Sequence, residues 1–120
     1  MKTFTNSNAR DPRQAATLAR DARTSGKAVS FVAGGSDLLA LVKERTVQPD
    51  VLVNLRTMQG AGEVSSAGGT VTIGAGVTLD ALSRHETIRA QFPALAEAAG
   101  SVATPQIRNV GTIGGNVAQR

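Results

Sequence analysis

The chain has 120 residues and a formal net charge of +4, with 41% hydrophobic residues and only three aromatic side chains, all phenylalanine. This length suits one small domain or part of a larger one, and the apolar content is sufficient for a core of Val, Leu, Ile and Ala. Because the sequence has no cysteine and a single histidine, it excludes a disulfide scaffold, a thiolate nucleophile and a thiolate-bound metal or iron–sulfur cluster within this chain.

The first half of the chain predicts a β-α-β-α-β order, which is typical of helices packed on a small parallel sheet. Asp11 is suited to cap a helix that has Pro12 at its first position, and Gly26 is a natural C-terminal stop. Between them, Ala15, Leu18, Ala19 and Ala22 follow helical spacing and form one apolar face. The expected elements are a strand over 2–5, a helix over 10–26, a strand over 28–33, a helix over 36–45 and a strand over 50–55.

The second half changes character. The stretch GEVSSAGGTVTIGA predicts two short strands around a Gly-Gly turn. A helix capped by Thr78 follows over 78–88, with Leu79 and Leu82 on one face, and another begins at Pro93 and ends near Gly100. The last five residues, NVAQR, resemble the start of a strand, so we expect the chain to stop inside a larger fold. A composition shift near 60–62 predicts two subdomains, 1–59 and 60–120.

Two glycine pairs stand out, Gly34–Gly35 and Gly114–Gly115, each expected between an apolar stretch and a polar one. A strand that ends in two glycines before a helix exposes several backbone N–H groups in one concave turn, and the missing Cβ lets an anion approach closely. The alternative is a tight turn that merely needs a positive φ, and for one pair alone that alternative is favoured. Two such segments in one chain make a candidate diphosphate site, in which they would bind the two phosphates from opposite sides.

The residues after the first pair leave alternatives open. Ser36 either caps the following helix or donates a hydrogen bond to a phosphate oxygen. Asp37 fits less well, because a carboxylate beside a phosphate is repelled. It either caps backbone N–H groups while pointing away, or binds a ribose or another hydroxyl.

Other chemistries find little support. There is no G-x-x-x-x-G-K-[ST] loop, and GAGVTL lacks the last glycine of a dinucleotide-binding motif. No carboxylate pair or nucleophile–base pair is visible, so we assign no catalytic residue and no metal site. His85 is expected to be a solvent-facing helix residue. Arg108 is expected to contact a phosphate, to meet a partner subunit or to orient the second glycine segment.

Location and macromolecular partners follow from what the sequence lacks. The first ten residues have no apolar secretory stretch, and no apolar run approaches the roughly 20 residues of a membrane span. We therefore expect a cytoplasmic protein with no membrane span. The arginines are scattered, without a Lys/Arg run or an aromatic platform, so nucleic-acid binding is not expected.

Three segments together resemble the flavin-binding subunit of molybdenum hydroxylases, the xanthine dehydrogenase, aldehyde oxidoreductase and carbon monoxide dehydrogenase family. They are FVAGGSDLLALVKERTVQPDVLVNL, TIGAGVTL and TPQIRNVGTIGGNVAQR, and the resemblance covers nearly the whole chain in order. It implies an α/β, two-subdomain FAD-binding fold of the vanillyl-alcohol oxidase and CO dehydrogenase flavoprotein type, truncated at its C-terminus. It also implies that both glycine segments hold the FAD pyrophosphate. Carried over by position, the binding residues are Val32, Ala33, Gly34, Gly35, Ser36, Asp37 and Leu38 in the first segment, and Thr112, Gly114, Gly115 and Asn116 in the second.

The same resemblance implies a function and partners. Electrons would leave a substrate at a molybdenum cofactor on a large subunit, pass through iron–sulfur clusters on a small subunit, and reach this FAD. NAD⁺, a quinone or oxygen would then accept them. Two alternatives remain open: a partial non-catalytic domain that serves as an assembly surface, and a stand-alone flavin oxidoreductase.

Overall fold

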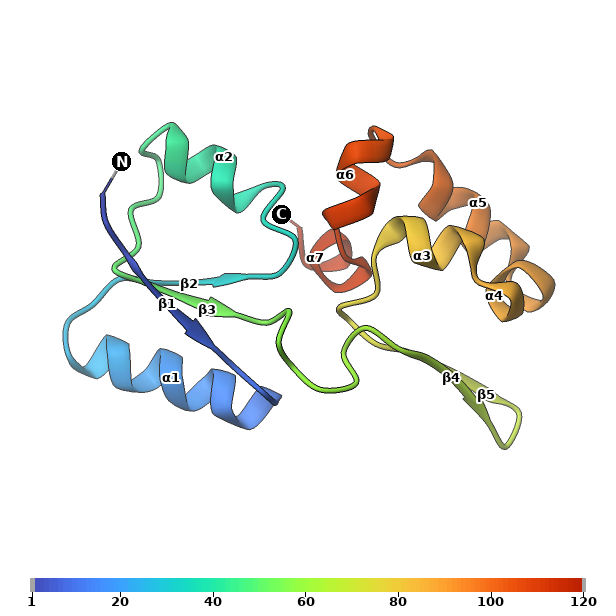
Figure 1. Cartoon of the computed structure of the whole chain (residues 1–120), viewed down its shortest axis with the longest axis horizontal. Coiled ribbons are helices and arrows are strands. Elements are labelled where there is room, and N and C mark those ends of the chain that lie inside the picture. Colours follow the sequence, from blue (N-terminus) through green and yellow to red (C-terminus); the bar gives the residue numbers. More distant parts are fainter. Residues whose placement is uncertain (1, 120) are drawn as a thin grey trace. The chain divides into compact units, whose positions relative to one another are not determined.

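The computed structural model describes residues 2–119 (Figure 1). The chain divides into two compact units, Met1–Gln59 and Gly60–Arg120, and each is described by itself. Among residues 2–119, no helix is long and apolar enough to cross a bilayer.

The first unit is built on a three-stranded parallel sheet of β1 (Thr5–Asn8), β2 (Val29–Val32) and β3 (Val51–Asn54). The strands lie in the order β1-β3-β2. The central strand, β3, is the most buried of the three, since Val51, Leu52 and Val53 all lie in the core. The chain leaves β1 at one edge, crosses to the other edge and returns to the centre, with a helix in each crossover.

Two helices connect these strands, α1 (Pro12–Thr24) and α2 (Leu38–Lys43), and Figure 1 shows them on opposite sides of the sheet. The Asp11 carboxylate accepts a hydrogen bond from the Gln14 amide at 2.7 Å, so the predicted cap is confirmed. The predicted apolar face of α1 is also confirmed. Ala15 and Ala19 are buried against Val51 and Val53, with Leu18 and Ala22 beside them.

The position of the first strand was predicted wrongly. The expected strand covered 2–5, whereas β1 spans Thr5–Asn8 and pairs in register with Val51–Asn54. The four residues of β1 are all polar and show no strand pattern of their own. Pairing with the buried central strand decides where β1 lies, which is a tertiary effect.

The second unit begins with a two-stranded antiparallel hairpin, as predicted. Gly68 and Gly69 have φ values of +57° and +77°, the left-handed pair that a two-residue type I′ turn requires. A helical region follows, and Leu79, Leu82 and Ile88 form the centre of its core. The elements are β4 (Val64–Ala67), β5 (Thr70–Ile73), α3 (Leu79–Arg84), α4 (Glu86–Gln91), α5 (Pro93–Ser101), α6 (Pro105–Val110) and α7 (Ile113–Ala118).

The helix expected over 78–88 is broken at His85, which has an extended backbone and separates α3 from α4. Leu79 and Ile88 are nine residues apart, so one continuous helix would place them on opposite faces. Both are buried in the same core, at 2% and 0% exposure. The break turns the chain so that both side chains face inward.

The end of the chain also differs from the prediction. Gly114 and Gly115 lie in the first turn of α7, and residues 116–118 continue this helix instead of starting a strand. Arg120, the last residue of the expected strand, lies outside the described residues. The expected strand rested on composition, whereas the helix follows from a cap, since the Thr112 hydroxyl accepts a hydrogen bond from the Gly115 amide.

Candidate functional site

The first glycine segment connects β2 to α2, where the sequence placed it. Gly35 has a φ of +78°, which an L-residue adopts only with strain. Within residues 2–59, the backbone N–H groups of residues 34–38 donate to no backbone or side-chain acceptor. Two carbonyl groups of this segment do accept hydrogen bonds, since the Leu39 amide donates to Gly35 at 3.0 Å and the Leu41 amide donates to Asp37 at 3.2 Å.

This arrangement fits an anionic group. Five consecutive N–H groups without a protein acceptor, in a turn with one left-handed glycine, offer several positive partial charges to an anion. A Cβ on Gly35 would lie 3.1 Å from the Cδ1 atom of Leu39, so space beside Gly35 is also tight. The pyrophosphate of FAD carries the charge that such a row binds. The fit comes from the amide row and not from the dipole of α2, which has only six residues.

The side chains of this segment narrow the alternatives. Asp37 is the N-cap of α2, but its carboxylate makes no capping hydrogen bond, and Ser36 lies before the cap position. Capping is therefore not the role of either side chain in this unit. A hydrogen bond from Ser36 to a phosphate, and one between Asp37 and a ligand hydroxyl, remain predictions. Asp37 is exposed and Ser36 is half-buried.

The second glycine segment is built differently from the first, so the expectation of an equivalent setting is wrong. Its backbone donors are already used within the unit. The Ile113 amide donates to Val77 at 2.9 Å, the Gly114 amide to Ala75 at 2.9 Å, and the Asn116 amide to the backbone carbonyl of Thr112 at 2.9 Å. What remains accessible is the exposed Gly115 and the exposed Asn116, whereas Thr112 is 4% exposed and serves as the cap.

Close backbone packing explains several glycines of the second unit. A Cβ on Gly114 would lie 2.7 Å from the Ala75 carbonyl oxygen, and one on Gly76 would lie 2.9 Å from that of Ala61. Gly74 is packed even more tightly against Ala61. Segments 61–63, 74–79 and 111–114 are thus stacked backbone on backbone, and the stack holds Thr112 and the start of α7. No local pattern in the segment TIGAGVTL, which contains both Gly74 and Gly76, indicates this packing role.

His85 was expected on the solvent-facing side of a helix, but it does not lie there. It is half-buried at the junction between α3 and α4, and its Nδ1 atom is buried without a hydrogen-bond partner among the described residues. The prediction of a solvent-facing residue is therefore wrong.

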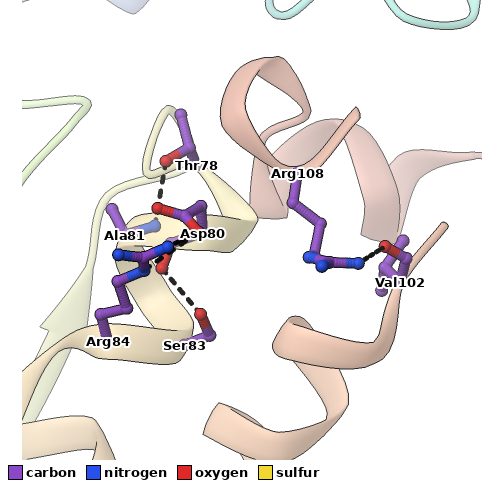
Figure 2. Close-up of polar contacts among 7 residues, drawn as sticks. All are labelled: Thr78, Asp80, Ala81, Ser83, Arg84, Val102 and Arg108. Atoms are coloured by element: carbon purple, nitrogen blue, oxygen red, sulfur yellow. Dashed lines mark hydrogen bonds and ion pairs between the residues drawn. The ribbon is translucent and has the colours of Figure 1, made fainter. Parts of the chain in front are cut away.

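Arg108 and the single carboxylates have structural partners. The Arg108 guanidinium donates to the carbonyl of Val102 at 2.8 Å, and Asp80 pairs with Arg84 on α3 (Figure 2). Asp50 pairs with Lys2 at 2.6 Å and accepts a hydrogen bond from the Ala28 amide at 2.8 Å. The hydrogen bond from Lys2, followed by that from Ala28, lowers the pKa of Asp50 below its ordinary value.

Metal binding has no candidate in the described part of the chain, since residues 2–119 contain no group of three or more His, Cys, Asp or Glu side chains that could hold an ion.

Comparison with known proteins decides the family. The model of the FAD-binding domain in molybdopterin dehydrogenase matches residues 2–120. This chain belongs to that family. The nicotinate dehydrogenase FAD-subunit of Eubacterium barkeri is 38% identical over 73% of this chain and 30% of its own length. The carbon monoxide dehydrogenase medium chain of Hydrogenophaga pseudoflava is 39% identical over 78% of this chain and 32% of its own length.

Comparison with solved structures supports the same family assignment. A carbon monoxide dehydrogenase chain from Hydrogenophaga pseudoflava has a TM-score of 0.88 and 33% identity, and the match covers 96% of this chain and 39% of that one. The α/β FAD-binding fold predicted from the resemblance is confirmed, and FAD is the cofactor of the family. The chain spans about a third of the length of the curated relatives that it matches.

Proposed function

We propose that this chain is part of the FAD-binding subunit of a molybdenum-containing hydroxylase or dehydrogenase, and that the whole protein is an oxidoreductase. In this proposal, the FAD receives electrons from iron–sulfur clusters on a small partner subunit, and a large partner subunit carries the molybdenum cofactor. An external acceptor such as NAD⁺ then takes the electrons. Family membership supports FAD, and the names of relatives, such as medium chain and FAD-subunit, support a place within a larger complex.

The observation that carries the proposal is the row of free backbone N–H groups at residues 34–38 around the left-handed Gly35. Gly34, Gly35, Ser36, Asp37 and Leu38 would donate these groups to the FAD pyrophosphate. Val32 and Ala33 lead into the row from β2, and the whole segment is anchored by the bond from the Leu55 amide to the Val32 carbonyl at 2.8 Å.

From the second unit, we propose Gly115 and Asn116 as the groups that face the cofactor, because they are exposed. Thr112 and Gly114 would support them from behind, through the cap and the backbone stack. When bound, the FAD supplies the redox chemistry, and the protein supplies binding and orientation. No residue of this chain is assigned a catalytic step.

The test compares two glycines with the same backbone conformation. Gly35 and Gly26 have φ values of +78° and +74°, so replacing either by valine introduces a similar backbone strain. Only Gly35 lies in the row of free amides, and a Cβ at Gly26 would meet nothing within 4 Å. We expect Gly35→Val to lose FAD from the purified native protein, and Gly26→Val to retain it. The measurement is the flavin released on denaturation, normalised to folded protein.

Equal flavin content in folded Gly35→Val and Gly26→Val proteins would show that the amide row is not the pyrophosphate site. A native protein that never contains flavin would instead favour the alternative of a non-catalytic assembly surface. A native protein that oxidises a small substrate without partner subunits would favour a stand-alone flavin oxidoreductase.

A further inference from the structure

We propose that Arg108 is a positioning residue for the second glycine segment, and that it acts by clamping the turn between α5 and α6. This inference rests on the proposed function, because its consequence is a weaker hold on FAD. The role does not require the guanidinium to touch the cofactor.

The clamp is visible in the hydrogen bonds of Arg108. Its Nη1 atom donates to the carbonyl oxygen of Val102 at 2.8 Å and to that of Ala103 at 3.3 Å (Figure 2 shows the first of these). Val102 is the C-cap of α5, whereas Arg108 lies in the last turn of α6. One side chain therefore ties the end of one helix to the body of the next.

The clamped turn is strained. Ala103 has a φ of +44°, and it is one of only two non-glycine residues with a positive φ in the described part of the chain. For an L-residue this conformation is unfavourable, and it persists only when neighbouring contacts enforce it. The two carbonyl groups that Arg108 binds belong to Ala103 and to the residue before it. Arg108 therefore stabilises the carbonyl orientation that accompanies the left-handed turn.

The turn determines where α6 begins. Thr104 follows Ala103 and caps α6, since its hydroxyl accepts a hydrogen bond from the Ile107 amide at 3.3 Å and its carbonyl accepts one from the Arg108 amide at 2.9 Å. At the other end of this six-residue helix, the Gly111 amide donates to the Ile107 carbonyl at 2.7 Å. The Gly111 carbonyl in turn accepts the Leu79 amide at 2.9 Å.

Only Gly111 separates α6 from Thr112, the cap of α7. The backbone stack anchors one side of Thr112, through Gly111 and Gly114, and α6 leads into it from the other side. Loss of the clamp would therefore loosen α6, so that Thr112 and the exposed Gly115 and Asn116 are supported from the stack alone. Binding groups that are held by supporting contacts lose affinity when those contacts are removed.

The experiment uses the native protein after removal of its flavin, with FAD as the probe. The variants are Arg108→Ala, Arg108→Lys, Ala103→Gly, and Arg108→Ala combined with Ala103→Gly. Arg89→Ala is the matched control, because Arg89 is an exposed arginine of α4 without a side-chain partner within residues 60–119. The readouts are the dissociation constant from flavin fluorescence, the visible circular dichroism of the bound flavin and the urea midpoint.

We expect Arg108→Ala to bind FAD about tenfold more weakly, which corresponds to one charged hydrogen-bond contact. Arg108→Lys should be intermediate, because an ammonium group keeps the charge but not the planar fork. Glycine adopts a left-handed conformation without strain, so it does not need the contacts of Arg108 to hold the turn. Adding Ala103→Gly to Arg108→Ala should therefore reduce the loss of FAD affinity to about threefold or less. Arg89→Ala should bind FAD like the wild type.

Equal FAD affinity in Arg108→Ala and Arg89→Ala would overturn the inference. A double variant that binds FAD as weakly as Arg108→Ala alone would also overturn it. If Arg108→Ala does not fold, Arg108→Lys with and without Ala103→Gly carries the same comparison. A wild-type protein that does not bind FAD would overturn the proposed function, and this outcome is distinguishable because the urea midpoints still report the coupling of Arg108 with Ala103.

Discussion

The Gly114 amide donates to the Ala75 carbonyl oxygen at 2.9 Å, and a Cβ on Gly114 would lie 2.7 Å from that same oxygen. The neighbouring Gly115 is exposed, and the nearest atom to its Cβ would be the Thr112 hydroxyl at 3.1 Å. Two adjacent glycines that look equivalent in the sequence thus face different surroundings. Gly114 is required by packing against a backbone, whereas Gly115 leaves room toward solvent.

This difference predicts opposite effects of the same substitution. Gly114→Ala should lower the free energy of unfolding by about 3 kcal/mol, because the new methyl group overlaps a backbone that cannot move freely. Gly115→Ala should leave it within about 1 kcal/mol of the wild type, because the helix preference of alanine offsets the tight contact with Thr112. Urea unfolding of both variants measures the difference. A Gly114→Ala protein as stable as Gly115→Ala would contradict the stacked arrangement.

The Thr112 hydroxyl should stabilise α7 by capping it. It accepts a hydrogen bond from the Gly115 amide at 3.1 Å while Thr112 itself is almost fully buried. Thr112→Val should cost about 1–2 kcal/mol, because it leaves a helix N–H group without an acceptor at a buried cap. Thr112→Ser is the matched control, since it keeps the hydroxyl, and it should lose less. Thermal or urea unfolding decides, and equal losses in both variants would assign the effect to packing of the threonine methyl group.

Because of the ion pair between Asp50 and Lys2, the free energy of unfolding should depend on pH in the acidic range. The pKa of Asp50 is lowered in the folded state, so the unfolded state binds its proton more readily. The contribution is therefore fully present above the ordinary value of 3.8 and is lost as the pH falls through the lower folded value. The difference in unfolding free energy between wild type and Asp50→Asn should be constant above about pH 5 and should shrink below it. Lys2→Ala should reduce the same dependence, and a difference that stays constant down to about pH 2 would argue against the pair.

The proposed place in a complex predicts which chains accompany this one. The native protein should co-purify with a large molybdenum-containing chain and a small cysteine-rich chain, because this chain has no cysteine with which to hold an iron–sulfur cluster. Reduction of the FAD by substrate should require both partners. A pull-down from the native source, combined with a spectrum of the flavin before and after substrate, tests this. Full substrate-dependent reduction in the isolated chain would contradict it.

Much of the fold followed from local signals. Asp11, Pro12 and the apolar spacing of Ala15 and Ala19 predicted α1 with its cap and its buried face. The buried strand β3 was readable because Val51, Leu52 and Val53 follow one another. The run AGGSDLL was enough to expect a turn with free amides, because two adjacent glycines between a strand and a helix bring no Cβ atoms to cover the backbone. In these segments, the local preference and the tertiary environment agree.

Local patterns were thus enough to predict the β-α-β-α-β order, the glycine turn before α2 and, through resemblance, the FAD-binding family. The register of the polar strand β1, the break at His85 and the separate roles of Gly114 and Gly115 became apparent only in the folded chain. These features depend on contacts between residues far apart in the chain, such as Thr5 with Val51 and Gly114 with Ala75, and no local pattern records such contacts.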